Sequence, residues 1–306
     1  MTSTLPTERV VGRFAPSPSG RMHLGNVFTA LLAWLSVRSK GGSLLLRIED
    51  LDPDRSKAEF IDAIYDDLHW LGLDWDAEMP LQSTRAAVYH QAFERLPVYP
   101  CYCSRNELHA ASAPHASDGR LIYAGTCRNL SEEQRARQTR PPAWRVRVSE
   151  ETVSFRDGVF GTVQQDLTID CGDFILRRSD GVYAYQLAVV CDDADGGVTE
   201  VVRGCDLLDS TPRQIWLDRQ LGFPVPQFYH VPLLVASDGR RLSKREKGLD
   251  MAHLRQTRSP QELIGLLAFA AGLIDAPFPV TPQELLPYFR WEKIRQENIP
   301  IFAAIG

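Results

Sequence analysis

The chain has 306 residues, enough for one large domain or two modest ones. Hydrophobic residues make up 44% and charged residues 24%, which is typical of a globular protein with an apolar core of normal size. The formal net charge of −5 argues against a protein that coats nucleic acid through bulk positive charge, although it leaves room for a local basic groove.

The start of the chain and its apolar segments indicate a protein outside membranes. The first ten residues, MTSTLPTERV, are polar and lack the apolar core of a secretion signal. The longest apolar run, residues 263–274, is shorter than the roughly 20 residues that a bilayer span requires. The SPQE sequence at 259–262 has the form of a capping box and predicts a buried helix instead. We therefore expect a cytoplasmic protein with no membrane partner and no disulfides.

The first hundred residues alternate between strand and helix patterns. Residues 10–15 predict a buried strand, and helical spacing of apolar residues follows at 24–39. A second strand is expected in SLLLRIED, residues 43–50, followed by helices at about 56–71 and 84–95. An alternation of strand and helix predicts the parallel sheet of an α/β protein.

The remaining chain starts with a loop-rich insertion and then returns to regular patterns. Strands are expected at 143–149, within 155–165, at 173–190 as two strands around a turn at 179–181, and at 197–204. Residues 212–221 predict a helix, and the tail is expected to be mostly helical. We expect Cys171, Cys191 and Cys205, in strand-like stretches, to be core residues.

The segment RFAPSPSGRMHLGN, residues 13–26, joins the first predicted strand to the first predicted helix. Ligands of open α/β sheets bind at the carboxyl ends of strands, and helix N-termini attract phosphate. Gly20 and Gly25 would let a nucleotide approach the backbone, and His23 could donate a hydrogen bond to a phosphate. Taken alone, His23 is more typical of a surface histidine in an ordinary turn.

The second unusual segment is RRLSKREKG, residues 240–248, with five positive charges and one negative. Lysines next to Ser and Gly can hold phosphate as point charges. Taken alone, such a run is more typical of a solvated surface.

Together the two segments resemble the HIGH and KMSKS motifs of class I aminoacyl-tRNA synthetases. HLGN at 23–26 corresponds to the first motif, with Asn26 in place of the last His. RLSKR at 241–245 corresponds to the second and keeps Lys244. RFAPSPSG, LLLRIEDLDP, GVYAYQLAVVCDD and GVTEVVRGCDLL are similar to the glutamyl branch, so the resemblance spans about 12–248.

This resemblance implies an α/β fold with a class I synthetase-type Rossmann catalytic core. We expect the first half of that core at 1–97, a small zinc-binding insertion at 98–140 and the rest of the core at 141–235. The KMSKS-like loop and a short helical tail would occupy 236–306.

The resemblance also implies that the enzyme activates L-glutamate, which has two carboxylates and an ammonium group. Arginine binds carboxylates with a bidentate fork, and a carboxylate such as Glu49 can pair with the ammonium. The expected L-glutamate contacts are Arg13, Phe14, Ala15, Pro16, Ser17, Glu49, Tyr185 and Arg203.

The nucleotide implied is ATP, bound with Mg²⁺ on its phosphates. The expected ATP contacts are His23, Gly25, Asn26, Ser243 and Lys244. His23 and Lys244 would be catalytic, because they would stabilise the charge that develops on the transferred phosphate. Magnesium bound through substrate phosphates needs no dedicated protein cage.

The insertion contains Cys101, Cys103 and Cys127, and three thiolates close in space favour one structural Zn²⁺ with a fourth ligand. Chemistry alone favours His109 or His115 as that ligand. The resemblance favours Tyr123, because the glutamyl-queuosine enzymes of this family have Cys-x-Cys followed by Tyr-x-x-x-Cys.

The same resemblance implies that the acceptor of the glutamate is the queuosine base in the anticodon of tRNA(Asp). Val189 stands where tRNA-charging glutamyl enzymes have Asn, and only 58 residues follow Gly248, so we expect no anticodon-reading domain. The alternatives are a truncated glutamyl-tRNA synthetase that charges a tRNA 3′ end, and a non-catalytic module that binds zinc and RNA.

Overall fold

A five-stranded parallel sheet forms the centre of the computed structural model, which describes residues 9–104, 122–236, 239–240 and 249–301. Its strands, in spatial order, are β10 (Gln227–Val231), β9 (Glu200–Gly204), β1 (Val11–Phe14), β2 (Ser43–Leu46) and β3 (Ala77–Glu78). Every neighbouring pair runs parallel, so the predicted parallel α/β sheet is confirmed.

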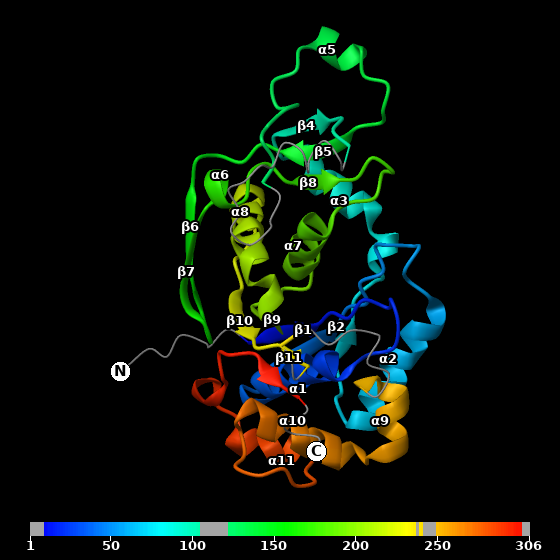
Figure 1. Cartoon of the computed structure of the whole chain (residues 1–306), viewed down its shortest axis with the longest axis vertical. Helices are drawn as coiled ribbons and strands as arrows, with labels where there is room; N and C mark the ends of the chain where they lie inside the picture. The colour runs from blue at the N-terminus through cyan, green and yellow to red at the C-terminus, as the bar shows by residue number, and fades with distance from the viewer. Residues whose placement is uncertain (1–8, 105–121, 237–238, 241–248, 302–306) are drawn as a thin grey trace.

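Helices cover both faces of this sheet (Figure 1). The helices α7 (Tyr185–Asp195) and α8 (Thr211–Leu221) lie on one face, and α1 (Leu24–Ser39) lies on the other. Along β2, Leu44 and Leu46 join the core on the α1 side, whereas Leu45 packs against the core of α7 and α8. Burial on both faces is the usual state of parallel sheets, because their crossover helices need both surfaces.

The predicted helices of the first hundred residues are present with slightly shifted ends. They are α1, α2 (Ala58–Leu71) and α3 (Ala86–Glu94), with a 3₁₀ turn at Gln82–Thr84 between the last two. Gly72 ends α2 in the left-handed conformation, with φ of 72°, which a residue with a side chain rarely adopts.

A second, antiparallel sheet lies at the far end of the molecule from the C-terminal helices (Figure 1). It consists of β4 (Val98–Cys101), β5 (Ala143–Val146) and β8 (Ile175–Arg177). The helix α5 (Glu132–Ala136) lies beyond it. The strands β6 (Thr152–Asp157) and β7 (Gly161–Asp166) form a hairpin along the side of the molecule.

The prediction of two strands at 173–190 is wrong in its second half. The turn is present, since the Arg178 amide donates to the Val182 carbonyl at 2.8 Å, and Tyr183 makes a single bridge to Arg177. From Tyr185, however, the chain forms α7, whose central residues are buried on all sides. A short apolar run that is buried all round has no periodicity that separates helix from strand.

The three isolated cysteines are also not in strands. Cys171 follows the short helix α6 (Leu167–Asp170) and Cys191 lies within α7, and both are buried. Cys205 begins a 3₁₀ helix, η2 (Cys205–Ser210), and is partly exposed, so it is not the core residue that was expected.

The C-terminal part is mostly helical, as expected. It contains α9 (Met251–Thr257), α10 (Pro260–Ala271), α11 (Pro282–Leu285), and 3₁₀ turns at Leu286–Tyr288 and Trp291–Lys293. The predicted capping box precedes α10, where the Ser259 hydroxyl accepts from the Glu262 amide. The short strand β12 (Ile299–Pro300) returns to pair with β11 (Leu234–Val235). Within the described ranges, no helix is long and apolar enough to cross a bilayer.

Candidate active site

A cavity of about 630 Å³ opens at the carboxyl ends of β1 and β9. The chain goes from β1 to β2 on one side and later returns to place β9 on the other, which is the switch point where α/β sheets bind ligands. Its walls include Arg13, Phe14, Ala15, Pro16, Ser17, His23, Gly25, Asn26, Glu49, Tyr185 and Arg203. The structure thus brings these predicted site residues together, whereas Ser243 and Lys244 lie outside the described residues.

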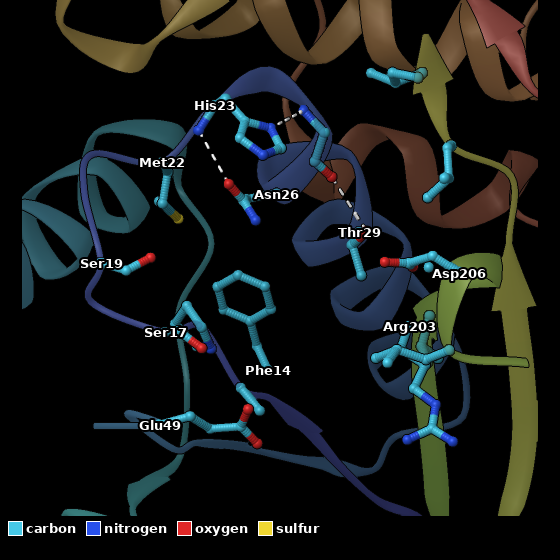
Figure 2. Close-up of a pocket in the computed structure, with 18 of the residues that line it drawn as sticks. Phe14, Ser17, Ser19, Met22, His23, Asn26, Thr29, Glu49, Arg203 and Asp206 are labelled. Carbon is cyan, nitrogen blue, oxygen red and sulfur yellow. Dashed lines mark hydrogen bonds between the residues drawn. The ribbon is translucent and has the colours of Figure 1, made fainter. Parts of the chain in front are cut away.

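One end of the cavity is the N-terminus of α1 (Figure 2). His23 is the N-cap residue, and its Nδ1 accepts from the Gly25 amide at 3.1 Å. Asn26 completes the cap, because its Oδ1 accepts from the His23 amide at 3.1 Å. An acceptor at Nδ1 places the hydrogen of the neutral ring on Nε2, so that nitrogen is a donor. Asn26 departs from the motif of the family, and here it has a structural role.

Gly25 lies close to the histidine ring, and a side chain at this position would crowd that ring. A Cβ atom at Gly25 would lie 3.0 Å from His23 Cε1 and 3.1 Å from Nδ1. The first turn of α1 contains no acidic residue, so its backbone N–H groups and dipole present positive potential. This end of the cavity is therefore suited to phosphate.

The chain that follows the basic segment 241–248 is anchored at this phosphate end. Before it, the Ala236 amide donates to the Arg240 carbonyl at 2.8 Å, directly after β11. After it, Asp250 makes an isolated antiparallel bridge to His23, and the Met251 amide donates to the Met22 carbonyl at 3.0 Å. The chain thus re-enters the described structure beside the N-terminus of α1, directly after the segment that contains Lys244.

The opposite end of the cavity contains the two predicted arginines, each almost fully buried. Arg13 Nε lies 3.3 Å from Asp193 Oδ1, and its Nη1 donates to the Val202 carbonyl at 3.1 Å. Arg203 donates through Nε to His230 and through Nη2 to Thr211. Its Nη1 is buried and has no hydrogen-bond partner among the described residues. A buried unpaired donor is costly, so this atom is suited to an anion that enters the cavity.

Glu49 and Tyr185 contribute a carboxylate and a hydroxyl to the same end. In Figure 2, Glu49 and Arg203 lie toward one end of the cavity and His23 toward the other. Burial raises the pKa of Glu49 above its ordinary value, although Arg47 and Arg13 oppose this shift. Burial also raises the pKa of Tyr185, with a further contribution from Glu49, so the hydroxyl keeps its proton. Burial removes the water that would stabilise the charged carboxylate of Glu49. A bound cation next to Glu49 would stabilise that charge instead.

Arg47 and Asp193 connect these groups, and no sequence pattern predicted their role. Arg47 is fully buried, donates to Asp193 Oδ1 at 2.5 Å and to Glu49 Oε1 at 3.2 Å, and so joins Glu49 to the carboxylate that contacts Arg13. Burial alone would raise the pKa of Asp193, but Arg47 and Arg13 outweigh it and the pKa is lowered. The sequence contains one indication of this role. Arg47 directly follows three leucines, and a charged residue at the end of a buried strand needs a partner.

The cysteines of the insertion form a compact group of potential metal ligands. The sulfurs of Cys101, Cys103 and Cys127 all lie within 4.8 Å of one another, and those of Cys103 and Cys127 are 3.6 Å apart. The Tyr123 hydroxyl lies 3.5 Å from the Cys101 sulfur. A tetrahedral Zn²⁺ with Zn–S bonds of about 2.3 Å separates its sulfurs by roughly 3.8 Å, so the spacing fits zinc. His109 and His115 lie outside the described residues.

Comparison with known proteins identifies the family. The profile described as "tRNA synthetases class I (E and Q), catalytic domain" matches residues 9–266. The chain belongs to this family. This synthetase is therefore an enzyme of the ligase class, as the two motifs predicted.

Relatives of this synthetase match almost its whole length. A protein of Symbiobacterium thermophilum named "Glutamyl-Q tRNA(Asp) synthetase" is 49% identical over 95% of each chain. A protein of the same name from Nitratidesulfovibrio vulgaris is 47% identical over 89% of this chain and 90% of its own. A glutamate tRNA ligase from Elizabethkingia meningosepticum, crystallised with its amino acid, superposes with a TM-score of 0.80 at 26% identity, covering 96% of this chain and 67% of that one.

Proposed function

We propose that this synthetase activates L-glutamate with ATP and transfers the glutamyl group to the queuosine base in the anticodon of tRNA(Asp). The observation that carries the proposal is one cavity with a phosphate-binding helix N-terminus at one end and two buried arginines with a carboxylate at the other. The names of the two relatives from Symbiobacterium and Nitratidesulfovibrio support the choice of acceptor.

The charges at the arginine end match glutamate. Arg13 and Arg203 would bind its two carboxylates, and Arg203 Nη1 is the buried donor that still needs an acceptor. Glu49 would pair with the ammonium group, while the segment 14–17 and Tyr185 close the walls. A substrate that lacks the carboxylate facing Arg203 would leave the buried Nη1 without an acceptor, which disfavours its binding.

Adenylation then needs no protein nucleophile. A carboxylate oxygen of glutamate attacks the α-phosphorus of ATP, and the bond from that phosphorus to the bridging oxygen breaks. Pyrophosphate leaves with the electron pair, and glutamyl-adenylate remains. His23 Nε2 and Lys244 would stabilise the charge on the phosphate oxygens, and Mg²⁺ bound to the phosphates would share that charge.

In the second step, a hydroxyl of the acceptor attacks the acyl carbon of the adenylate. The bond from that carbon to the phosphate oxygen breaks, AMP leaves, and the hydroxyl loses its proton.

Val189 bears on the choice of acceptor, because it is fully buried in α7 and places no polar group where tRNA-charging glutamyl enzymes have Asn. The runner-up is transfer to a tRNA 3′ end, and family membership disfavours a non-catalytic zinc and RNA-binding module.

Transfer of labelled glutamate to two forms of tRNA(Asp) tests the acceptor. We expect transfer to tRNA(Asp) that carries queuosine and none to the same transcript with unmodified guanosine. Glutamate-dependent exchange of pyrophosphate into ATP, measured without tRNA, reports the first step separately. Equal transfer to both forms would contradict queuosine as the acceptor and favour the tRNA 3′ end.

We propose that Cys101, Cys103, Tyr123 and Cys127 bind one structural Zn²⁺ that links the end of β4 to the later part of the insertion. Purified protein is expected to contain one zinc per chain, and Tyr123→Phe is expected to lower zinc affinity by roughly tenfold or more. Competition with a chelator measures this loss. Tyr102→Phe, which alters the neighbouring tyrosine, is the matched control and should keep wild-type affinity. If His109→Ala or His115→Ala loses zinc and Tyr123→Phe does not, the fourth ligand is a histidine.

A further inference from the structure

The guanidinium of Arg203 is hydrogen-bonded to two residues that do not line the cavity, His230 and Thr211. His230 on β10 is the direct strand partner of Arg203 on β9, and Arg203 Nε donates to His230 Nε2 at 3.1 Å. Arg203 Nη2 donates to the Thr211 hydroxyl at 2.8 Å. His230 and Thr211 are both fully buried. Two of the three guanidinium nitrogens are therefore fixed, and the third, Nη1, lacks a partner among the described residues.

The contact with Arg203 decides the tautomer of His230. A guanidinium has no acceptor, so His230 Nε2 must accept and the ring hydrogen must be on Nδ1. His230 Nδ1 lies 2.7 Å from Asp157 Oδ2, where it donates. Burial lowers the pKa of His230 despite the opposing effect of Asp157, and Arg203 lowers it further, so the ring is neutral.

Asp157 is itself fixed at the turn of the β6–β7 hairpin. Its Oδ1 accepts from the Val159 and Phe160 amides, each at 2.9 Å, and its Oδ2 also accepts from the His230 amide at 3.1 Å. The hairpin thus holds the carboxylate that orients the histidine, and the histidine orients the arginine. Of this hydrogen-bonded series, only Arg203 belongs to a sequence motif that predicted a site residue.

We propose that the Asp157–His230 pair is a positioning device that holds Arg203 with Nη1 directed at the substrate carboxylate. This inference rests on the proposed function, since it takes that carboxylate to belong to glutamate. An arginine side chain loses much rotamer freedom when it binds a ligand, and fixing it beforehand removes that cost from binding. The pair should therefore set the affinity for glutamate and leave the binding of ATP unchanged.

Replacement of His230 separates this role from simple core packing. His230→Phe keeps a ring stacked on Phe228 but removes the acceptor, whereas His230→Gln keeps an amide oxygen near the position of Nε2. In pyrophosphate exchange we expect His230→Phe to raise the KM for glutamate roughly ten- to hundredfold, the range for a hydrogen bond to a charged group. We expect the KM for ATP to stay unchanged and His230→Gln to restore most of the glutamate KM.

Two further variants keep the test decisive if His230→Phe does not fold. Asp157→Asn can still accept the hairpin amides, but its NH₂ can donate to His230 Nδ1 and so drive the hydrogen to Nε2, against Arg203. Thr211→Val removes only the hydroxyl. Both should raise the KM for glutamate. The matched control is Ser36→Ala. It also removes a fully buried hydroxyl that bonds to a charged group, since Ser36 donates to Glu200 away from the cavity walls.

The measurements distinguish a failure of the positioning role from a failure of the proposed glutamate activation. A glutamate KM that rises selectively in Asp157→Asn and Thr211→Val, but not in Ser36→Ala, supports the positioning role. Unchanged glutamate KM in these variants, or equal changes for glutamate and ATP, would overturn it. If the wild-type protein shows no glutamate-dependent exchange at all, the proposed function fails.

Discussion

Replacing Lys244 with alanine is expected to lower the kcat of glutamate-dependent pyrophosphate exchange by roughly 10²- to 10³-fold, the range for losing one group that stabilises transition-state charge. The Kd for glutamate should change little, because the arginines and Glu49 lie at the end of the cavity opposite the N-terminus of α1, where Lys244 is proposed to act on ATP. Pre-steady-state exchange and equilibrium binding of glutamate measure the two quantities.

The same segment offers a matched control for this prediction. Lys247→Ala removes the same charge three positions away, outside the motif of the family. If the general positive charge of 240–248 were sufficient, both variants would lose activity to a similar degree. We expect Lys247→Ala to retain nearly wild-type kcat, and unchanged exchange in Lys244→Ala would refute its assignment to ATP.

Replacing Arg47 with methionine is expected to lower the free energy of unfolding by about 3–5 kcal/mol, the usual cost of removing one partner from a buried ion pair. Arg47 has no exposed surface and contacts Asp193 and Glu49, and its loss leaves two buried carboxylates with less compensation. Urea unfolding at neutral pH measures the change.

Two comparisons test whether the buried charges cause that loss. Arg178→Met breaks an ion pair with Asp180 whose side chains are about half exposed, and it should cost at most about 1 kcal/mol. Adding Asp193→Asn to Arg47→Met removes one of the uncompensated charges and should recover part of the stability. Equal losses in Arg47→Met and Arg178→Met would show that burial of the pair does not matter.

Sequence patterns were sufficient where a segment carries its own periodicity. The apolar spacing at 24–39 predicted α1, and the SPQE sequence at 259–262 predicted the start of α10. Sequence patterns gave a wrong prediction at α7, because an apolar run that is buried on every side resembles a strand as much as a helix. The division of the chain at 97, 140 and 235 stays a prediction.

The groups predicted to contact glutamate and ATP are also largely local in the sequence. The segment 13–26 contains Arg13 at a strand end and His23 at the following helix start, so one βα unit supplies both ends of the cavity. The close spacing of Cys101, Cys103 and Cys127 along the chain likewise predicted the compact group that their sulfurs form.

Motifs and periodicity were enough to predict the family, the parallel α/β architecture and the chemical types present in the cavity. The buried groups that hold those side chains in place became visible only in the folded chain. Arg47 and Asp193 are 146 positions apart, and Asp157 and His230 are 73 apart. No periodicity or motif spans such distances, because strand pairing and the hairpin bring these residues together, and a buried charge finds its partner only after the chain has folded around it.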